Sequence, residues 1–135
     1  MDKERILVDS VPEAGKRDSV GNYIPAPVSN AIKFSNFLFT TAKPGRDSSG
    51  KLVDGIEGQT RQALDNISAL LKAGGTDMEH VVKTWVYVVD IKYFEPMNQV
   101  YSRYFKIPPA RTFLVTPGWF DPNQLIEIEA IAGIP

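Results

Sequence analysis

The densest apolar pattern in the chain lies between residues 81 and 89, where β-branched and aromatic side chains dominate. Large apolar residues occupy both sets of alternating positions, so we expect a strand that is covered on both faces. Two further strands are expected at Arg111–Val115 and Leu125–Ala132. The segment 117–123 between them is rich in Pro, Gly, Asp and Asn and predicts a turn.

Shorter apolar runs in the N-terminal part predict a hairpin and an edge strand. Residues 31–41 contain two such runs, separated by Ser35–Asn36, a pair typical of a hairpin turn. Residues 1–25 are rich in charged residues, Gly and Pro, with one apolar patch at Ile6–Val8. We therefore expect a brief edge strand followed by an irregular N-terminal arm.

Two segments show the spacing of amphipathic helices. The first runs from residue 56 to residue 73, with a start at Asp54 and Glu57 that resembles a capping box and a stop at Gly74–Gly75. Its apolar residues at helical spacing are Ile56, Ala63, Leu64, Ile67, Leu70 and Leu71. The second helix is expected from about Tyr93 to Phe105.

The order of these elements predicts the architecture. Leaving the N-terminal edge strand aside, the order is β-β-α-β-α-β-β, which predicts an α+β sandwich of one sheet and two helices. Two amphipathic helices cover one face of such a sheet. Because the strands are apolar on both faces, a homo-oligomer packed through the sheet is the simplest cover for the second face.

The composition is that of a single domain spanning residues 1–135. Hydrophobic residues make up 43% of the chain and the formal net charge is -1, which gives no electrostatic reason to bind nucleic acid or an anionic membrane. The first residues contain no apolar targeting segment, and no apolar run approaches the length that spans a membrane. We expect a cytoplasmic protein with neither nucleic acid nor membrane as a partner.

The content of cysteine and histidine narrows the chemistry. The chain contains no cysteine, which excludes thiol nucleophiles, thiolate metal sites and disulfides. Its single histidine, His80, has no second histidine with which to share a zinc site. With Asp77 and Glu79 nearby, His80 could be a base that titrates near neutral pH, but a capping or surface position is favoured. We expect neither a metal site nor a cofactor.

A polar, turn-rich loop follows the hairpin, and its residues 45–52 almost match a phosphate-binding P-loop. Leu52 stands where that motif requires Ser or Thr, and the segment 52–55 does not look like the start of a helix. A loop that leads from hairpin to helix is the favoured interpretation.

Arg111 stands at the start of an apolar strand, soon after a pair of prolines. A planar guanidinium in such a place usually pairs with a carboxylate, either an internal one or that of a small ligand. Glu127 and Glu129 are the internal candidates, because the period of a strand places both on the same face. They could equally form an acidic stripe that faces solvent. From the residues alone, an internal ion pair and a ligand clamp remain equally open.

A dispersed set of residues carries a family resemblance that covers about residues 26 to 132. The set consists of Gln59–Ile67, Gly75, Val81–Thr84, Phe94, Asn98, Tyr101, Phe105, Pro109–Arg111 and Ile126–Ala132. In order and spacing, these residues resemble the Rid (YjgF-like) family of reactive intermediate deaminases.

The resemblance implies a chorismate-mutase-like α+β fold, with one mixed β-sheet and two helices on one face, assembled as a homotrimer with ligand pockets between subunits. It implies that Arg111 holds a substrate carboxylate and that Glu127 positions or activates water. The expected activity is hydrolysis of small enamine or imine carboxylic acids, of the 2-aminoacrylate type, to a 2-oxo acid and ammonia. The alternative is a non-catalytic trimer that binds a small carboxylate metabolite in a regulatory role.

Three positions depart from the best-known branch of the family and predict a reshaped pocket. Val28 stands where that branch has a tyrosine, Ala42 where it has a glycine, and Phe113 where it often has a cysteine. The candidate substrate-binding residues are Val28, Thr41, Ala42, Asn98, Phe113 and, on the N-terminal arm, Tyr23.

Overall fold

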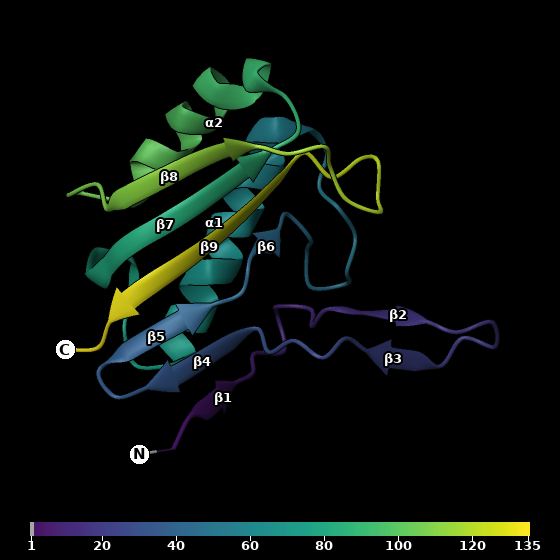
Figure 1. Cartoon of the computed structure of the whole chain (residues 1–135), viewed down its shortest axis with the longest axis horizontal. Helices are drawn as coiled ribbons and strands as arrows, with labels where there is room; N and C mark the ends of the chain where they lie inside the picture. The colour runs from purple at the N-terminus through teal and green to yellow at the C-terminus, as the bar shows by residue number, and fades with distance from the viewer. Residues whose placement is uncertain (1) are drawn as a thin grey trace.

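The computed structural model describes residues 2–135, without the side chains of residues 16, 17 and 23. Its body is one sheet with the strand order β1-β4-β5-β9-β7-β8, and β6 pairs with β9 (Figure 1). These strands are β1 Glu4–Ile6, β4 Ala31–Phe34, β5 Phe37–Thr40, β6 Lys43–Pro44, β7 Val81–Val88, β8 Ala110–Val115 and β9 Ile126–Gly133. β7 and β8 run parallel and the other described pairs are antiparallel, so the sheet is mixed, as expected.

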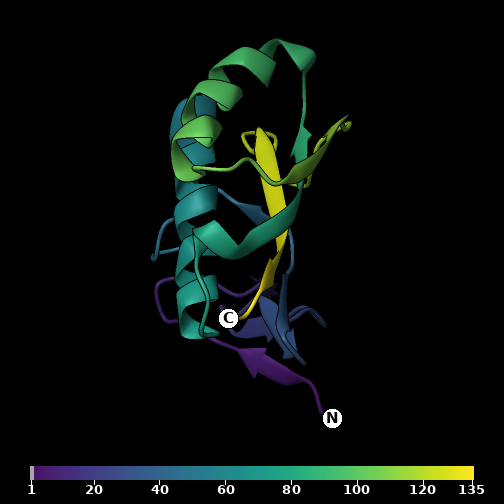
Figure 2. The same ribbon diagram turned by 90° about the vertical axis from the view of Figure 1, so that its left-hand side faces the viewer.

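Both helices, α1 (Gly55–Ala73) and α2 (Phe94–Tyr101), lie on the same face of this sheet (Figure 2). The residues of α1 at helical spacing, such as Leu64 and Ile67, are fully buried. They form one core with Ile126 and Ile128 of β9. Burial of each such side chain contributes about 1.5–3 kcal/mol, so this helix-to-sheet layer supplies much of the stability. The expected arrangement of two helices on one face is confirmed.

The C-terminal end of α1 is the one expected from the sequence, and the N-terminal end differs from the expectation. At the C-terminal end, the Gly74 N–H bonds to the carbonyls of Leu70 and Leu71, and Gly75 has a positive φ of 90°, so the expected stop is confirmed. At the N-terminal end, Asp54 occupies the cap position, but its side chain accepts no capping hydrogen bond. The expected capping box is therefore wrong.

The second helical segment is divided rather than continuous. The α-helix covers only Phe94–Tyr101, between 3-10 turns at Ile91–Tyr93 and Ser102–Tyr104. Asp90 caps the first turn by accepting from the Lys92 N–H. After the helix, the Ser102 hydroxyl donates to the Gln99 carbonyl, a local bond of the kind that competes with a regular helix end.

The N-terminal arm holds a second, two-stranded sheet of β2 (Gly15–Arg17) and β3 (Tyr23–Pro25), which reaches away from the body (Figure 1). Its turn is built on Asp18, whose carboxylate accepts from the backbone N–H groups of Val20 and Asn22. This side-chain bonding stabilises a tight turn, so the expectation of an irregular arm is wrong. The expected edge strand is present as β1.

The second face of the sheet is open in the single chain. Along β7, Thr84, Val86 and Val88 are buried under the helices, whereas Trp85 and Tyr87 on the other face are only partly buried. Among the described residues, no helix covers this second face (Figure 2). The large apolar side chains expected on both faces are present, but the chain by itself covers one face only.

Candidate functional site

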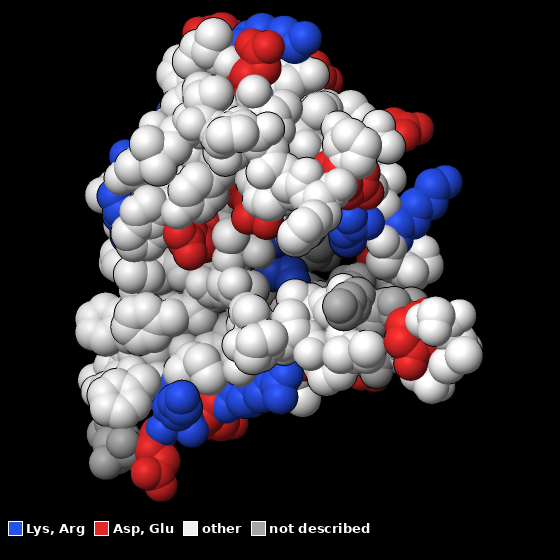
Figure 3. Space-filling model, turned by 45° about the vertical axis from the view of Figure 1, so that its right-hand side comes forward, with Lys and Arg blue, Asp and Glu red and all other residues white. Residues whose placement is uncertain are grey.

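A cleft of about 790 Å³ opens between the N-terminal arm, the loop after β6 and the loop before β9. Glu127, Lys43 and Trp119 are among the residues that line it. Figure 3 shows this side of the molecule hollowed between the body and the arm, with acidic and basic side chains around the hollow. A smaller cavity of about 340 Å³ shares Glu127 and Trp119 and continues toward Tyr87 and Glu129.

Glu127 projects from β9 toward the cleft. Its neighbours Ile126 and Ile128 point to the helices and are fully buried, so alternation along the strand turns Glu127 to the other face. Burial raises the pKa of Glu127 above its usual range, and the side chains of Gln124 and Trp119 reduce the rise. Gln124 Nε2 is buried and has no hydrogen-bond partner among the described residues, so it is a donor left free beside the cleft.

Glu129 lies on the same face as Glu127, as expected, but its carboxylate is already engaged. The Tyr87 hydroxyl donates a hydrogen bond of 2.6 Å to Glu129 Oε1. This bond, together with burial, raises the pKa of Tyr87 to about 12. Of the two glutamates, Glu127 is thus the one that faces the larger cleft.

Lys43 lines the cleft from β6, where Lys43 pairs with Ile128 of β9 and Pro44 pairs with Glu127. Its ammonium donates to Asn30 Oδ1 at 2.7 Å and to the Pro12 carbonyl at 3.0 Å. Burial lowers the pKa of Lys43 to about 8, although the negative charges of Glu127 and Glu13 oppose that change. The cleft therefore contains a buried cation and a partly buried carboxyl group.

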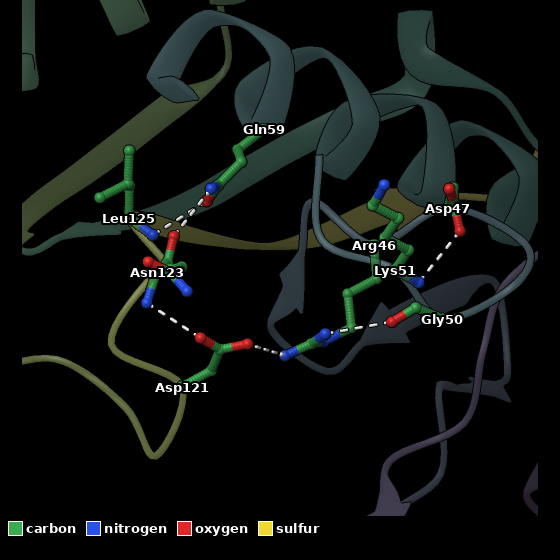
Figure 4. Close-up of polar contacts among 8 residues, drawn as sticks. All are labelled: Arg46, Asp47, Gly50, Lys51, Gln59, Asp121, Asn123 and Leu125. Carbon is green, nitrogen blue, oxygen red and sulfur yellow. Dashed lines mark hydrogen bonds and ion pairs between the residues drawn. The ribbon is translucent and has the colours of Figure 1, made fainter. Parts of the chain in front are cut away.

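The loops that form the cleft are tied to each other and to α1 (Figure 4). Arg46 pairs with Asp121 at 3.1 Å and also donates to the Gly50 carbonyl. Gln59 of α1 donates to the Asn123 carbonyl and accepts from the Leu125 N–H, both at 2.9 Å. Two segments distant in sequence are thereby joined into one rigid rim.

The loop of residues 45–52 has no phosphate-binding form. Arg46 and Leu52 are joined by an antiparallel bridge, and α1 begins only at Gly55. The Asp47 carboxylate accepts hydrogen bonds from the backbone N–H groups of Ser49 and Lys51. These donors are therefore already occupied and do not form a cradle for a phosphate. The expectation of a loop that leads from hairpin to helix is confirmed.

Arg111 lies on β8, the strand at the edge of the sheet, and does not face the cleft. It pairs in register with Thr84, which is buried under α2, whereas Glu127 pairs with Tyr87 on the other face. Its guanidinium donates to Asn98 Oδ1 at 2.7 Å and stacks 4.8 Å from the ring of Tyr101. Of the two alternatives left open by the sequence, the internal ion pair with Glu127 or Glu129 is therefore excluded, because the described hydrogen-bond partner of Arg111 is a neutral amide.

The candidate residues divide into two groups. Val28, Thr41 and Ala42 line the cleft with Glu127. On the helix-covered face, Asn98 bonds to Arg111, and Phe113 lies two positions along β8 with its ring edge-on to that of Phe94. The candidate Tyr23 side chain lies outside the described residues. One chain does not bring the two groups together.

Comparison with known proteins connects these features to a family. The family model described as Endoribonuclease L-PSP matches residues 21–134, which is most of the chain. The chain belongs to the Rid (YjgF-like) family. The resemblance inferred from the dispersed residues is thereby confirmed.

Individual relatives give the same assignment to the Rid family. A RutC family protein of Pyrococcus horikoshii is 45% identical, over 78% of this chain and 86% of that protein. The human 2-iminobutanoate/2-iminopropanoate deaminase is 38% identical, over 78% of this chain and 79% of that protein. Among solved structures, YyfA of Yersinia pestis, a Rid-family protein of unknown function, has 34% identity and a TM-score of 0.86, over 98% of this chain and 100% of that chain.

Among the cleft residues of this Rid-family chain that the sequence did not identify are Lys43, Trp119 and Gln124. Lys43 had one available signal, because it is the only charged residue between Lys33 and Arg46 and follows an apolar run. Trp119 and Gln124 lie in and after a segment interpreted only as a turn. Their proximity to Glu127 depends on tertiary contacts that no local pattern encodes.

Outside the cleft, His80 has the structural role favoured from the sequence. Its Nδ1 lies 2.8 Å from Asp77 Oδ1, in a 3-10 turn that Asp77 also caps. In the described part of this Rid-family chain, no three His, Asp or Glu side chains gather in a way that could hold a metal ion. No helix within residues 2–135 is long and apolar enough to cross a membrane.

Proposed function

We propose that this Rid-family protein is a homotrimeric hydrolytic deaminase that converts small enamine or imine carboxylic acids to 2-oxo acids and ammonia. Two relatives support the reaction class, since one is named Reactive Intermediate Deaminase A and another 2-iminobutanoate/2-iminopropanoate deaminase. The chemistry needs a carboxylate clamp, an oriented water and a proton acceptor, and it needs no cofactor.

Arg111 is the proposed carboxylate clamp. Among the described residues, Arg111 forms no ion pair, and its hydrogen-bond partner is the neutral Asn98 amide. That bond and the stacking on Tyr101 hold the guanidinium plane in one orientation. A fixed fork of donors is suited to bidentate binding of a substrate carboxylate.

Glu127 is the proposed proton acceptor. Its partial burial raises its pKa toward neutrality, which makes the carboxylate a better base than an exposed one. Water adds to the imine carbon as one of its protons passes to Glu127 and the C=N electron pair moves to nitrogen, which then takes that proton from Glu127 to give a neutral carbinolamine. The C–N bond breaks as the hydroxyl proton of the carbinolamine passes through Glu127 to the leaving nitrogen, which gives ammonia, the 2-oxo acid and the regenerated carboxylate.

The observation that carries the proposal is the separation of these two groups onto opposite faces of one sheet. Arg111 lies on the edge strand, where a neighbouring copy can reach it, and Glu127 lines a cleft on the open face. The open face also exposes Phe37 and Phe39 at 46% and 40%, an apolar surface suited to contact between copies. Assembly would unite the clamp of one copy with the base of the next.

Replacement of Arg111 tests the assignment. Arg111→Ala should lower kcat/KM by about 100-fold or more, since each hydrogen bond between charged groups contributes about 1.5–3 kcal/mol. The assay follows ammonia and 2-oxo acid released from a small imino acid generated in place by an amino-acid oxidase. The control is Arg103→Ala, which removes an exposed arginine from the turn after α2. Equal turnover by both variants would refute the clamp.

The same preparation separates the deaminase from the non-catalytic alternative. A binding protein would be stabilised against heat by a small 2-oxo acid, in a manner lost in Arg111→Ala, yet would release no ammonia. RNA cleavage has less support, because the net charge is -1 and Figure 3 shows charges of both signs around the hollow.

A further inference from the structure

Lys43 is the buried cation of the cleft, and the family resemblance assigns it no role. The residue is 4% exposed. It stands directly after Ala42 and before Pro44, and Pro44 pairs in register with Glu127. Transfer of an ammonium from water to such a place is unfavourable unless its partners compensate.

The direct partners of Lys43 do not require a charge. They are the amide oxygen of Asn30 and the carbonyl of Pro12, both neutral. Among the described residues, Lys43 takes part in no direct ion pair. A neutral amide could satisfy the same oxygens without the desolvation penalty of a cation, so these bonds alone give no reason for the charge.

The same bonds fasten the start of the arm to the cleft. Asn30 Nδ2 lies 3.3 Å from the Val11 carbonyl and 3.4 Å from that of Pro12, which Lys43 also contacts. Pro12 and Glu13 line the cleft opposite Glu127. Lys43 and Asn30 therefore hold one wall of the cleft, and the ammonium is fixed near that wall.

We propose that Lys43 is a positioning residue for Glu127. Its clamped ammonium holds the wall of the cleft and supplies the positive charge that keeps Glu127 ionised, ready to accept a proton from the attacking water. This inference rests on the proposed function, because it requires a reaction in which Glu127 is the base. It accounts for a buried charge that the hydrogen bonds of Lys43 do not explain.

The pH dependence follows from the groups that face each other in the cleft. Glu127 and Glu13 act on Lys43, whereas Lys43, Glu129, Gln124 and Trp119 act on Glu127. Because the pKa of Lys43 is lowered to about 8, its charge is present below that pH and lost above it. Glu127 accepts protons only above its own raised pKa. Activity should therefore fall on the acid side as Glu127 takes up a proton, and the charge of Lys43, which is present throughout that range, should set the pH at which this fall occurs.

Two substitutions separate the charge of Lys43 from its hydrogen bonds. Lys43→Gln keeps N–H donors for Asn30 and Pro12 but removes the charge. It should lower kcat more than KM at acid pH and move the acid limb of kcat/KM to higher pH. Lys43→Arg keeps the charge and should leave the acid limb in place. The control is Lys51→Met, at an exposed lysine on the neighbouring loop.

Titration of Glu127 itself tests the inference without any turnover. The protein is prepared with ¹³C-labelled glutamate side chains and followed by NMR. The carboxyl signal that is missing from the spectrum of Glu127→Gln is assigned to Glu127. Its pKa should be higher in Lys43→Gln than in the unsubstituted chain, and unchanged in Lys51→Met. Equal titration of Glu127 in all three would overturn the inference, as would an acid limb that moves as far in Lys43→Arg as in Lys43→Gln. Coupled titration in a chain that releases no ammonia would refute the proposed function and leave the coupling standing.

Discussion

Glu127 and Lys43 bring opposite charges into one cleft, and burial disfavours the charged form of each. The pKa of Glu127 is raised and that of Lys43 is lowered, so both move toward neutral pH. Groups that exchange protons with a substrate work best in this range. Glu129 differs, because Tyr87 donates a hydrogen bond to it. One strand thus presents two glutamates with different environments.

The ionised form of Glu127 should lower the stability of the folded chain. Because folding raises its pKa, stability is lost as pH rises from the usual value of 4.5 through the raised one. Glu127→Gln, which mimics the neutral form, should therefore raise Tm at pH 7 by roughly 2 °C while abolishing turnover. Calorimetry across pH measures the first effect and the ammonia assay the second.

The difference in Tm should disappear well below pH 4.5, where Glu127 is protonated in both the folded and unfolded states. Glu4→Gln, at an exposed residue of β1, is the matched control and should leave Tm unchanged. A lower Tm for Glu127→Gln at pH 7 would mean that the cleft stabilises the anion, contrary to the raised pKa.

At the scale of elements, the cleft depends on how closely the loop after β6 approaches α1. A Cβ added to Gly45 would lie 2.5 Å from the Gln59 backbone, closer than real Cβ atoms come to other heavy atoms. Gln59 is also the residue that bonds to the loop before β9 at Asn123 and Leu125. One position on α1 therefore sets the place of both loops.

Gly45→Ala should destabilise the fold by about 1–3 kcal/mol, because the added methyl group must displace the backbone of α1 or of the loop. Urea unfolding monitored by tryptophan fluorescence measures the change. Gly133→Ala is the control, since a Cβ there meets no atom within 4 Å. Equal unfolding midpoints for the two variants would mean that the loop and helix can separate without loss.

Periodic elements could be predicted from the sequence, and contacts between distant segments could not. The helix expected at 56–73 is observed at Gly55–Ala73, and the strand expected at 81–89 at Val81–Val88, because side-chain spacing reports burial directly. The arm hairpin was missed, since it depends on hydrogen bonds to one side chain, Asp18. Lys43 was missed because its partners lie 13 and 31 residues away.

The candidate site was predicted by residue type but not by geometry. The sequence placed Glu127 and Glu129 on one face correctly, because strand period determines that relation within one strand. Whether Arg111 shares that face depends on the register of β8 against β7, and that register is a tertiary property. The sequence leaves an internal ion pair open for this reason, and the register excludes it.

At the scale of the whole molecule, the dominant feature is a sheet covered on one face only. The large apolar side chains of Phe37 and Phe39 on β5 and of Leu114 on β8 are each at least 40% exposed. Exposed apolar surface of this kind is typical of contact between protein chains. In the proposed homotrimer, this face forms the interface and the clefts lie beside it.

Mixing two inactive variants tests whether the site spans copies. Arg111→Ala lacks the clamp and Glu127→Gln lacks the base, so neither homotrimer should be active. If each site takes its clamp from one copy and its base from the next, random mixed trimers should contain about one quarter of the normal number of complete sites. Co-refolding of equal amounts, followed by the ammonia assay, measures this recovery. No recovery in verified mixed trimers would place both groups of each site in one chain.

The placement of Arg111 and Glu127 on opposite faces also links catalysis to protein concentration. In the proposed assembly, a dissociated chain has a folded cleft and an ordered arginine but no complete site. Dilution below the assembly constant should therefore lower the specific activity while leaving the helix and strand content of each chain unchanged. At each protein concentration, the rate per chain would then measure the fraction of chains that are assembled into trimers.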